Sequence, residues 1–243
     1  MTTDGSGART GPGAGPVPPR EWFGREVLDV GPDLLGATLT TTTVEGSVTL
    51  RITEVEAYRG LADPGSHAFR GPTARNAAMF GEPGRLYVYR HLGLHTCVNL
   101  VCGPPGLASA ALLRAGEVVD GVELARARRV RAGVVRSDTE IARGPARLAV
   151  ALGIDLSWYG RDVTEPSGAV VVRVPRGVPS SPGEPSRAGE PGAVVWYRSG
   201  PRVGVGGPGG DAAVYPWRFW LDDEPTVSAY RAAAPRRRRA TKP

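Results

Sequence analysis

The seven residues from 52 to 58 constrain the fold of this chain more than any other stretch. They read Ile-Thr-Glu-Val-Glu-Ala-Tyr. Because side chains of a β-strand point alternately to its two faces, a strand here places Glu54, Glu56 and Tyr58 on one face. Unpaired charge is costly to bury. The stretch therefore predicts a strand whose polar face either meets solvent or forms the wall of a site.

The window around this strand, residues 51–114, concentrates side chains that can do chemistry. It holds all three histidines of the chain, two further tyrosines and an asparagine, which are His67, His91, His95, Tyr87, Tyr89 and Asn99. The surrounding sequence is rich in Val, Ala and Gly. We therefore expect this window to form a cleft.

The composition is that of a globular protein, with 41% apolar and 22% charged residues in 243. No apolar run reaches the roughly 18 residues that a membrane-spanning helix needs. The N-terminus lacks the basic-then-apolar pattern of a signal peptide. Cys97 and Cys102 have no Cys-x-x-Cys spacing and are expected to be reduced, buried thiols. We expect a cytoplasmic protein without a membrane partner, associated with the nucleoid if it is bacterial.

The charge of the chain permits a nucleic-acid partner but does not prove one. The formal net charge is +6 and the sequence pI is about 9.8. Nearly all of the cations are arginines, because the only lysine is Lys242. That lysine lies in a C-terminal segment that includes four consecutive arginines, residues 236–239.

The order of the predicted elements favours an α+β fold. We expect one domain over residues 20–231, between a disordered leader over 1–19 and a basic disordered tail over 232–243. A Pro, Gly, Ser and Glu-rich segment, residues 177–192, is expected to be a surface loop. Strands come first, helices are inserted and further strands follow, without βαβ alternation. This order predicts a curved, mainly antiparallel sheet with peripheral helices.

Individual elements follow from local patterns. We expect strands over residues 38–43, 48–58, 85–89, 94–100, 109–118, 170–174 and 215–221. We expect helices within 21–35, over 121–131 and from 144 to about 153. The helix over 121–131 is expected to bury Val122, Leu124 and Val130 and to expose its four arginines. Residues 59–84 are a long irregular loop, which inside a compact domain is usually functional.

Several kinds of catalysis are disfavoured by what the cleft lacks. His91 and His95 are four residues apart, but their flanks favour strands and no Cys or His-Glu-x-x-His pattern completes a metal site. The sequence has no Gly-x-Ser-x-Gly motif, and its one lysine lies in the tail, which disfavours covalent catalysis. We therefore expect no metal and no cofactor. Two readings remain, namely Glu54 or Glu56 as a general base acting on water, or two solvated glutamates.

Eight segments, in chain order, resemble one known family. They are Glu54-Val55-Glu56-Ala57-Tyr58, Ser66-His67, Arg75-Asn76-x-x-Met79-Phe80, Pro83-Gly84-x-Leu86-Tyr87-Val88-Tyr89, Asn99, Leu112-Leu113-Arg114-Ala115, Gly144-Pro145-Ala146-Arg147-Leu148 and Arg202-Val203-Gly204-Val205-Gly206. Together they resemble the alkyladenine (3-methylpurine) DNA glycosylase family over roughly residues 22–231. Several motifs in the same order are far more specific than any one of them.

The resemblance implies a monofunctional hydrolase that starts base excision repair without AP-lyase activity. Such enzymes flip a damaged purine out of double-stranded DNA and hydrolyse its N-glycosidic bond with water, using neither a metal nor a lysine. The implied substrates are 3-methyladenine and 7-methylguanine, with hypoxanthine and ethenoadenine as further candidates. We expect a monomer. Two rivals stay open, a non-catalytic nucleic-acid-binding protein of the same fold and the related tRNA-binding domain of formyltransferases.

The resemblance also assigns catalytic roles by position. It makes Glu56 the base that activates the water, and Arg114 and the Val203 carbonyl the groups that hold this water. Glu54 is expected to support the site.

By the same resemblance, Tyr58, His67 and Tyr89 sandwich the flipped base, and Asn99 forms the pocket floor, where the amino group of normal guanine would clash. A cationic alkylated purine is attracted by aromatic faces.

The resemblance also implies a protruding β-hairpin that enters the DNA. Its tip, Leu92-Gly93, carries a leucine where well-known members of the family have a tyrosine. A leucine can still act as an apolar wedge between base steps, although it stacks less well. Arg147, at the start of its helix, is expected to contact phosphates of the DNA backbone.

Overall fold

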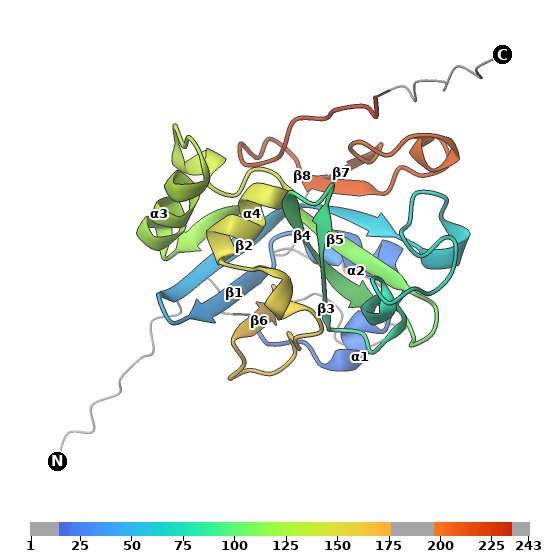
Figure 1. Ribbon diagram of the computed structural model, residues 1–243, viewed down its shortest axis with the longest axis horizontal. Helices are drawn as coiled ribbons and strands as arrows, with labels where there is room; N and C mark the ends of the chain where they lie inside the picture. The colour runs from blue at the N-terminus through green and yellow to red at the C-terminus, as the bar shows by residue number, and fades with distance from the viewer. Residues whose placement is uncertain (1–14, 176–196, 235–243) are drawn as a thin grey trace, which may run out of the picture.

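The predicted glutamate-bearing strand is the centre of the sheet. In the computed structural model, which describes residues 15–175 and 197–234, it is strand β2, Gly46–Tyr58 (Figure 1). The other strands are β1 Thr38–Thr43, β3 Leu86–His91, β4 His95–Cys102, β5 Ser109–Asp120, β6 Val170–Arg173, β7 Tyr197–Gly200 and β8 Arg218–Leu221. The α-helices are α1 Arg20–Phe23, α2 Val27–Asp33, α3 Val122–Ala132 and α4 Pro145–Leu152. Short 3-10 turns span Gly60–Ala62, Ala77–Phe80, Asp138–Glu140, Leu156–Trp158 and Pro208–Gly210.

The described strands form one antiparallel sheet, in the order β3-β4-β5-β2-β1-β6. Strand β2 pairs along one edge with β5. Along its other edge it pairs first with β1 and then, near its end, with β8, which also carries β7. This arrangement confirms the predicted α+β class and the mainly antiparallel sheet.

The pairing of β2 with β5 is irregular beside the two glutamates. Ile52 lies opposite Gly116, Glu54 opposite Ala115 and Val55 opposite Leu113, so the register shifts twice. Such bulges bend a strand and redirect side chains. The bulge on β5 falls at Arg114, which is thereby placed between the polar side chains of β2.

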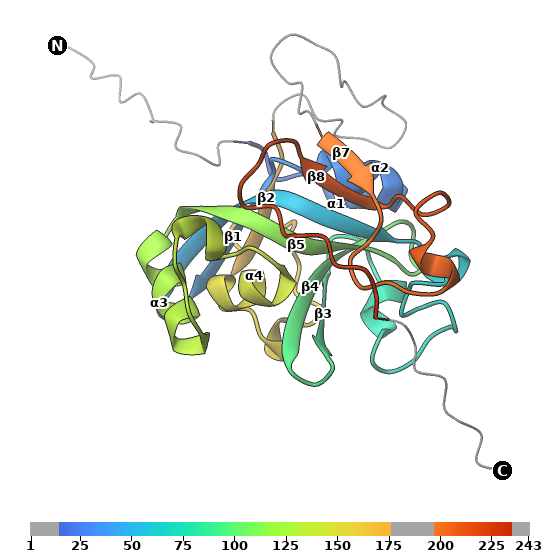
Figure 2. The same cartoon turned by 90° about the horizontal axis from the view of Figure 1, so that it is seen from above.

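The helices lie on both sides of the central strands (Figure 2). Helices α1 and α2 lie on one side of β2 and β5, and α3 and α4 on the other. Their apolar side chains join the sheet in a core that includes Trp22, Phe23, Leu50, Leu113 and Leu148. A smaller core cluster under the predicted cleft contains Ala68, Met79, Tyr87, Val101, Ala108 and Ala110. The long loop after β2 therefore packs onto the sheet.

The hairpin of β3 and β4 protrudes from the domain, as predicted (Figure 2). Its turn follows His91, and both Leu92 and Gly93 have positive φ angles, 51° and 71°. A left-handed conformation is strained for leucine and free for glycine. The tip thus presents its leucine to solvent on a tight turn.

Three expectations need correction. Gly15 and Pro16, predicted as part of the leader, lie against the end of β6: the Arg173 side chain donates to the Gly15 carbonyl at 3.3 Å, and the N–H of Val174, just after the strand, donates to the Pro16 carbonyl at 3.1 Å. In α3, Val130 is exposed, whereas Arg128 and Arg129 are buried because backbone carbonyls and Glu45 accept their hydrogen bonds. The predicted strand over 215–221 is regular only in β8.

The predicted loop over 177–192 and most of the predicted tail lie outside the described residues. Among the residues described, none of the helices is both long and apolar enough to cross a bilayer.

Candidate active site

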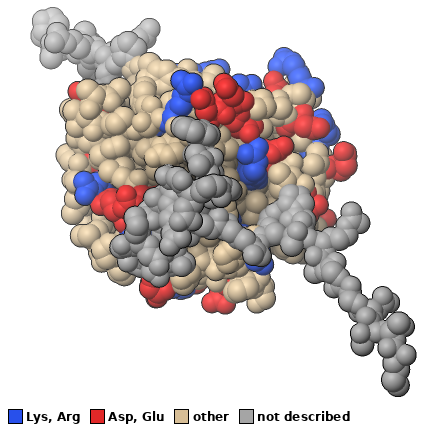
Figure 3. Space-filling view, turned by 180° about the vertical axis from the view of Figure 1, so that it is seen from behind, with Lys and Arg blue, Asp and Glu red and all other residues tan. Residues whose placement is uncertain are grey.

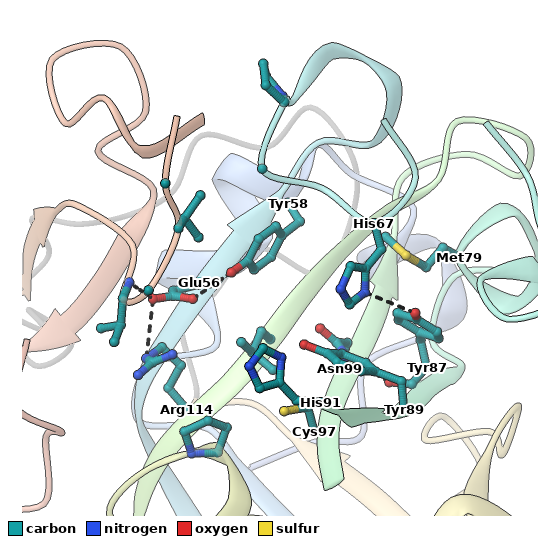
Figure 4. A pocket seen from close by; sticks show the side chains of 18 of the residues that line it. Glu56, Tyr58, His67, Met79, Tyr87, Tyr89, His91, Cys97, Asn99 and Arg114 are labelled. Atoms are coloured by element: carbon teal, nitrogen blue, oxygen red, sulfur yellow. Dashed lines mark hydrogen bonds and ion pairs between the residues drawn. The ribbon is translucent and has the colours of Figure 1, made fainter. Parts of the chain in front are cut away.

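A cavity of about 550 Å³ opens between the β2–β5 strands, the β3–β4 hairpin and the loops after β2 and β7 (Figure 4). Its walls contain all seven residues that the resemblance assigned to catalysis and to the base pocket, namely Glu56, Tyr58, His67, Tyr89, Asn99, Arg114 and Val203. The size is typical of small-molecule pockets. The predicted cleft is therefore a real cavity, and the candidate residues meet in it although 147 positions separate Glu56 from Val203.

Glu56 lies in the wall of this cavity with no exposed surface. Its Oε1 accepts a hydrogen bond from the Val203 N–H at 2.6 Å, and its Oε2 accepts one from the Tyr58 hydroxyl at 2.8 Å. The reading of two solvated glutamates is therefore wrong. The sequence did not indicate the contact of the Val203 amide, because a backbone group leaves no trace in the residue type.

Arg114 bridges the two glutamates of β2. Its Nε donates to Glu54 Oε1 at 2.8 Å and lies 3.4 Å from Glu56 Oε1. Burial works to lower the pKa of Arg114, but the carboxylates of Glu56 and Glu54 outweigh it and hold this pKa above its usual value. The guanidinium is thus a fixed positive charge at the end of the cavity.

Glu54 is buried in a dense cluster of donors behind Arg114. Its Oε1 accepts bonds from Arg114, from Arg218 at 2.7 Å and from the Ser228 hydroxyl at 2.9 Å, and its Oε2 accepts one from the Ser228 N–H at 2.7 Å. Burial raises the pKa of Glu54, but Arg114, Arg218 and Ser228 together hold it below 4.5. Glu54 does not line the cavity. It is placed to support Arg114.

Aromatic rings form the opposite wall (Figure 4). Tyr87 and Tyr89 stack with ring centroids 5.4 Å apart, and the His67 ring meets Tyr89 edge-on at 4.6 Å. The Nδ1 atom of His67 lies 3.3 Å from the Tyr87 hydroxyl. Tyr58 completes the slot from β2. The cavity thus has a polar end at Glu56 and an aromatic end at His67.

The ionisation of these rings suits a slot for a flat ligand. Burial raises the pKa of Tyr58 well above 10 and that of Tyr87 to about 12, so both stay neutral. Burial lowers the pKa of His67, and the nearby Arg75 and His91 side chains lower it further. At neutral pH the slot therefore carries uncharged rings beside the charged pair of Glu56 and Arg114.

Asn99 lies at the base of the cavity on β4 and is buried. Its side-chain amide donates to the Tyr87 carbonyl at 2.9 Å, across the β3–β4 pairing. This bond fixes the side chain against the strand. Asn99 is therefore a rigid part of the cavity lining.

Two predicted DNA-contacting residues lie outside the cavity wall. Leu92 and Leu94, at the hairpin tip, expose 80% and 77% of their surface. Arg147 lies in the first turn of α4 and is partly exposed, two residues after Pro145 of the cavity wall. Leu92 and Arg147 thus lie close in sequence to His91 and Pro145, which line the cavity.

Sequence reasoning gave no role to Arg202 and Asp63, which form a fully buried ion pair beside Tyr58. The two residues are 139 positions apart. Arg202 stood in one of the segments that carry the resemblance, but without a role of its own, and Asp63 stood in none. No sequence pattern relates such distant positions.

Comparison with known proteins identifies the class of protein to which this chain belongs. The sequence model of the family described as "Methylpurine-DNA glycosylase (MPG)" matches residues 21–225. The chain belongs to this family, which decides between it and the formyltransferase domain. It is thus a DNA glycosylase of the 3-methyladenine type, a hydrolase of N-glycosyl bonds that acts on DNA in repair.

Curated relatives agree over most of the chain. A protein of Streptomyces avermitilis is 54% identical over 220 residues, which are 90% of this chain and 94% of the relative. One of Leifsonia xyli is 51% identical over 216 residues, 88% of this chain and 92% of the relative. One of Mycobacterium tuberculosis is 44% identical over 206 residues, 83% and 88% of the two chains. All three carry the name "Putative 3-methyladenine DNA glycosylase".

Proposed function

We propose that this glycosylase excises alkylated purines, 3-methyladenine and 7-methylguanine first, from double-stranded DNA by means of a water activated by Glu56. Hypoxanthine and ethenoadenine are further candidate substrates. One observation carries the proposal: a shielded carboxylate and a fixed guanidinium lie at one end of a cavity whose other end is a slot of neutral aromatic rings.

Hydrolysis of the N-glycosidic bond of an alkylated purine needs mainly a positioned water and a general base. Glu56 takes a proton from water, the water oxygen bonds to the anomeric carbon, and the N-glycosidic bond breaks with its electron pair leaving on the base. An alkylated purine is cationic and therefore leaves readily. The negative charge of Glu56 also favours the positive charge that develops on the sugar. Arg114 and the carbonyl of Val203 are proposed to hold the water.

The aromatic end of the cavity is proposed to bind the flipped base. Tyr58, His67 and Tyr89 offer ring faces and edges to a flat purine, and the π faces of the tyrosines attract a cationic base. Asn99 is proposed to reject normal guanine, because a side chain tied to the backbone at 2.9 Å cannot move aside for an amino group. Damaged bases pair weakly and cost less to flip.

DNA is proposed to bind on the side from which the hairpin projects. Arg90 on the hairpin, Arg147 on α4 and Arg231 beside the cavity supply positive charge there. On the side that faces away in Figure 1, acidic and basic side chains lie next to one another (Figure 3). Phosphate contacts of this kind position a protein on DNA without reading sequence. We propose a monomer that acts in the cytoplasm, on the nucleoid.

Leu92 is proposed to fill the gap that the flipped base leaves. We expect Leu92→Ala to lower excision from duplex DNA by about tenfold, because an unfilled gap makes flipping less favourable by roughly 1–2 kcal/mol. Excision of the same lesion from single-stranded DNA should not change. Leu94→Ala, at the neighbouring exposed leucine, is the matched control. If Leu92→Ala lowered excision equally on duplex and on single-stranded DNA, Leu92 would not act by filling the gap in the duplex.

A panel of duplexes, each with one lesion, tests the proposed function. Abasic sites formed by the wild-type protein are measured for 3-methyladenine, 7-methylguanine, hypoxanthine and ethenoadenine, with undamaged duplex as control. We expect excision of the two methylated purines and none from the control. Tight binding to every lesion without abasic sites would instead identify a non-catalytic binding protein of the same fold.

A further inference from the structure

Arg202 is buried to 99% next to the cavity wall, and its guanidinium donates four hydrogen bonds. Its Nη1 donates to Asp63 Oδ2 at 2.5 Å and to the Ala57 carbonyl at 3.0 Å. Its Nη2 donates to Asp63 Oδ1 at 2.7 Å and to the Gly209 carbonyl at 2.8 Å. The two parallel bonds to one carboxylate are the strong, directional form of an ion pair.

Three aromatic rings surround the same guanidinium. Its central carbon lies 4.6 Å from the ring centroid of Tyr58, 5.3 Å from that of Trp217 and 5.8 Å from that of Tyr215. A desolvated cation beside an aromatic face is attracted to it. Tyr58 is thus held from behind by Arg202, while its ring lines the cavity.

These contacts join three segments that are far apart in the sequence. They are the end of β2, the loop after β2 that contains Asp63, and the loop after β7 that contains Arg202 itself. Asp63 is fixed in turn by the N–H groups of Arg59 and Gly65. All three segments contribute residues to the cavity wall.

Both donors to Glu56 adjoin this cluster. The Tyr58 hydroxyl donates to Oε2 and its ring rests on Arg202. The Val203 N–H donates to Oε1 and directly follows Arg202 in the chain. The guanidinium itself does not line the cavity, so it does not touch a bound base.

The backbone leaves just enough room for this arginine. A Cβ atom at Gly65 would lie 2.6 Å from Nη2 of Arg202 and 2.8 Å from a methyl group of Val205. The φ angle of Gly65 is not in the left-handed region. Gly65 is therefore required for close packing against Arg202 and Val205 and not for an unusual backbone conformation.

We propose that Arg202 is a positioning residue for the hydrolysis: paired with Asp63, it fixes the Tyr58 hydroxyl and the Val203 amide and so sets the orientation of the Glu56 carboxylate. This rests on the proposed function, in which Glu56 activates the water. Lysine cannot replace Arg202. Its ammonium group is a point charge on a flexible stem, so it cannot form the two parallel hydrogen bonds to Asp63 or stack on the Tyr58 ring.

Single-turnover excision by R202K tests the inference, with R25K as the matched control. Arg25 is also buried, pairs with Asp33 at 2.8 Å and lies 4.5 Å from the Trp22 ring centroid, but none of these residues lines the cavity. We expect R202K to lower the rate constant between about tenfold and 100-fold, since small misplacements of a catalytic group cost this much. R25K should lower the thermal stability and the active fraction of the protein but leave the single-turnover rate constant of that fraction unchanged. DNA affinity of both should stay within about twofold of wild type.

A second measurement does not depend on activity. The Tyr58 phenol carbon is observed by ¹³C NMR, assigned by its loss in Y58F, and should move in E56Q and in R202K but not in R25K. Where R202K folds poorly, G65A displaces the guanidinium while keeping its charge and should give the same two changes. A wild-type rate constant in the active fraction of R202K, with an unmoved Tyr58 signal, would overturn the role of Arg202. Absence of excision by the wild type would instead count against the proposed function, and the Tyr58 signal would still decide whether Arg202 holds this ring.

Discussion

Two glutamates of one strand, two residues apart and on the same face, have opposite surroundings. Glu54 accepts four hydrogen bonds, from Arg114, Arg218 and twice from Ser228. Glu56 accepts one bond on each oxygen, from Tyr58 and from the Val203 amide, and faces the cavity. Both are fully buried, so exposure does not distinguish them.

The two glutamates differ in how much hydrogen-bond acceptor capacity their carboxylates have left. A carboxylate has about four acceptor sites, and those of Glu54 are used by the protein. Glu56 keeps acceptor capacity beside the cavity, where a water could use it. One glutamate balances the charge of two buried arginines, while the other keeps the acceptor capacity that the proposed chemistry needs.

The largest expected effect on stability follows from removing the charge of Glu54. We expect Glu54→Gln to lower the free energy of unfolding by about 3–5 kcal/mol, because buried Arg218 loses its counter-charge and buried Arg114 loses one of its two. Arg114 and Arg218 have side chains only 7% and 5% exposed. Urea denaturation measures this loss of unfolding free energy. Glu56→Gln is the control and should cost about 1 kcal/mol, so an equal or larger cost for E56Q would break the contrast.

Acid should remove part of the same stabilisation. In the folded protein the pKa of Glu54 is lowered from its ordinary value of 4.5, which the unfolded chain retains. Between the folded-state pKa and the unfolded-state pKa the unfolded chain binds more protons, so stability rises with pH. The contribution of Glu54 is therefore complete above about pH 4.5 and is lost as the pH falls through the lowered pKa. Unfolding free energies of wild type and E54Q, measured from pH 7 downward, should converge. A constant difference between the two would contradict this expectation.

A smaller effect is expected from the donor to Glu56. Tyr58→Phe removes the hydroxyl that donates at 2.8 Å but keeps the ring on Arg202. Since a hydrogen bond to a charged group contributes about 1.5 kcal/mol, we expect a roughly tenfold lower single-turnover rate. Tyr87→Phe, which leaves Glu56 untouched, is the matched control. If the two variants were equally active, Tyr58 would be only a wall of the base slot.

Much of this contrast could be predicted from the sequence, because it depends on local rules. Alternation along β2 placed Glu54, Glu56 and Tyr58 on one face, and the structure confirms it through their shared contacts with Arg114 and with each other. The hairpin tip at Leu92 and the antiparallel sheet also follow from turn residues and from strand patterns.

The rest could not be predicted, because it depends on contacts between distant segments. Nothing local relates Glu54 to Ser228, 174 positions away, or Asp63 to Arg202. Burial of Arg128 and Arg129 in α3 escaped prediction for the same reason, since their acceptors come from other segments. The strand expected from residue 215 is shortened to β8, and Tyr215 and Trp217 instead face Arg202.

The central claim, that Glu56 and not Glu54 activates the water, is tested most directly by single-turnover excision of one 7-methylguanine from duplex DNA by E56Q and E54Q. The assay runs at a temperature where both variants are folded, and DNA binding is measured in parallel. We predict that E56Q lowers the rate constant by about 10³-fold with DNA binding retained, and that E54Q lowers it by about tenfold or less. Near-normal cleavage by E56Q, or a greater loss in E54Q than in E56Q, would contradict the account.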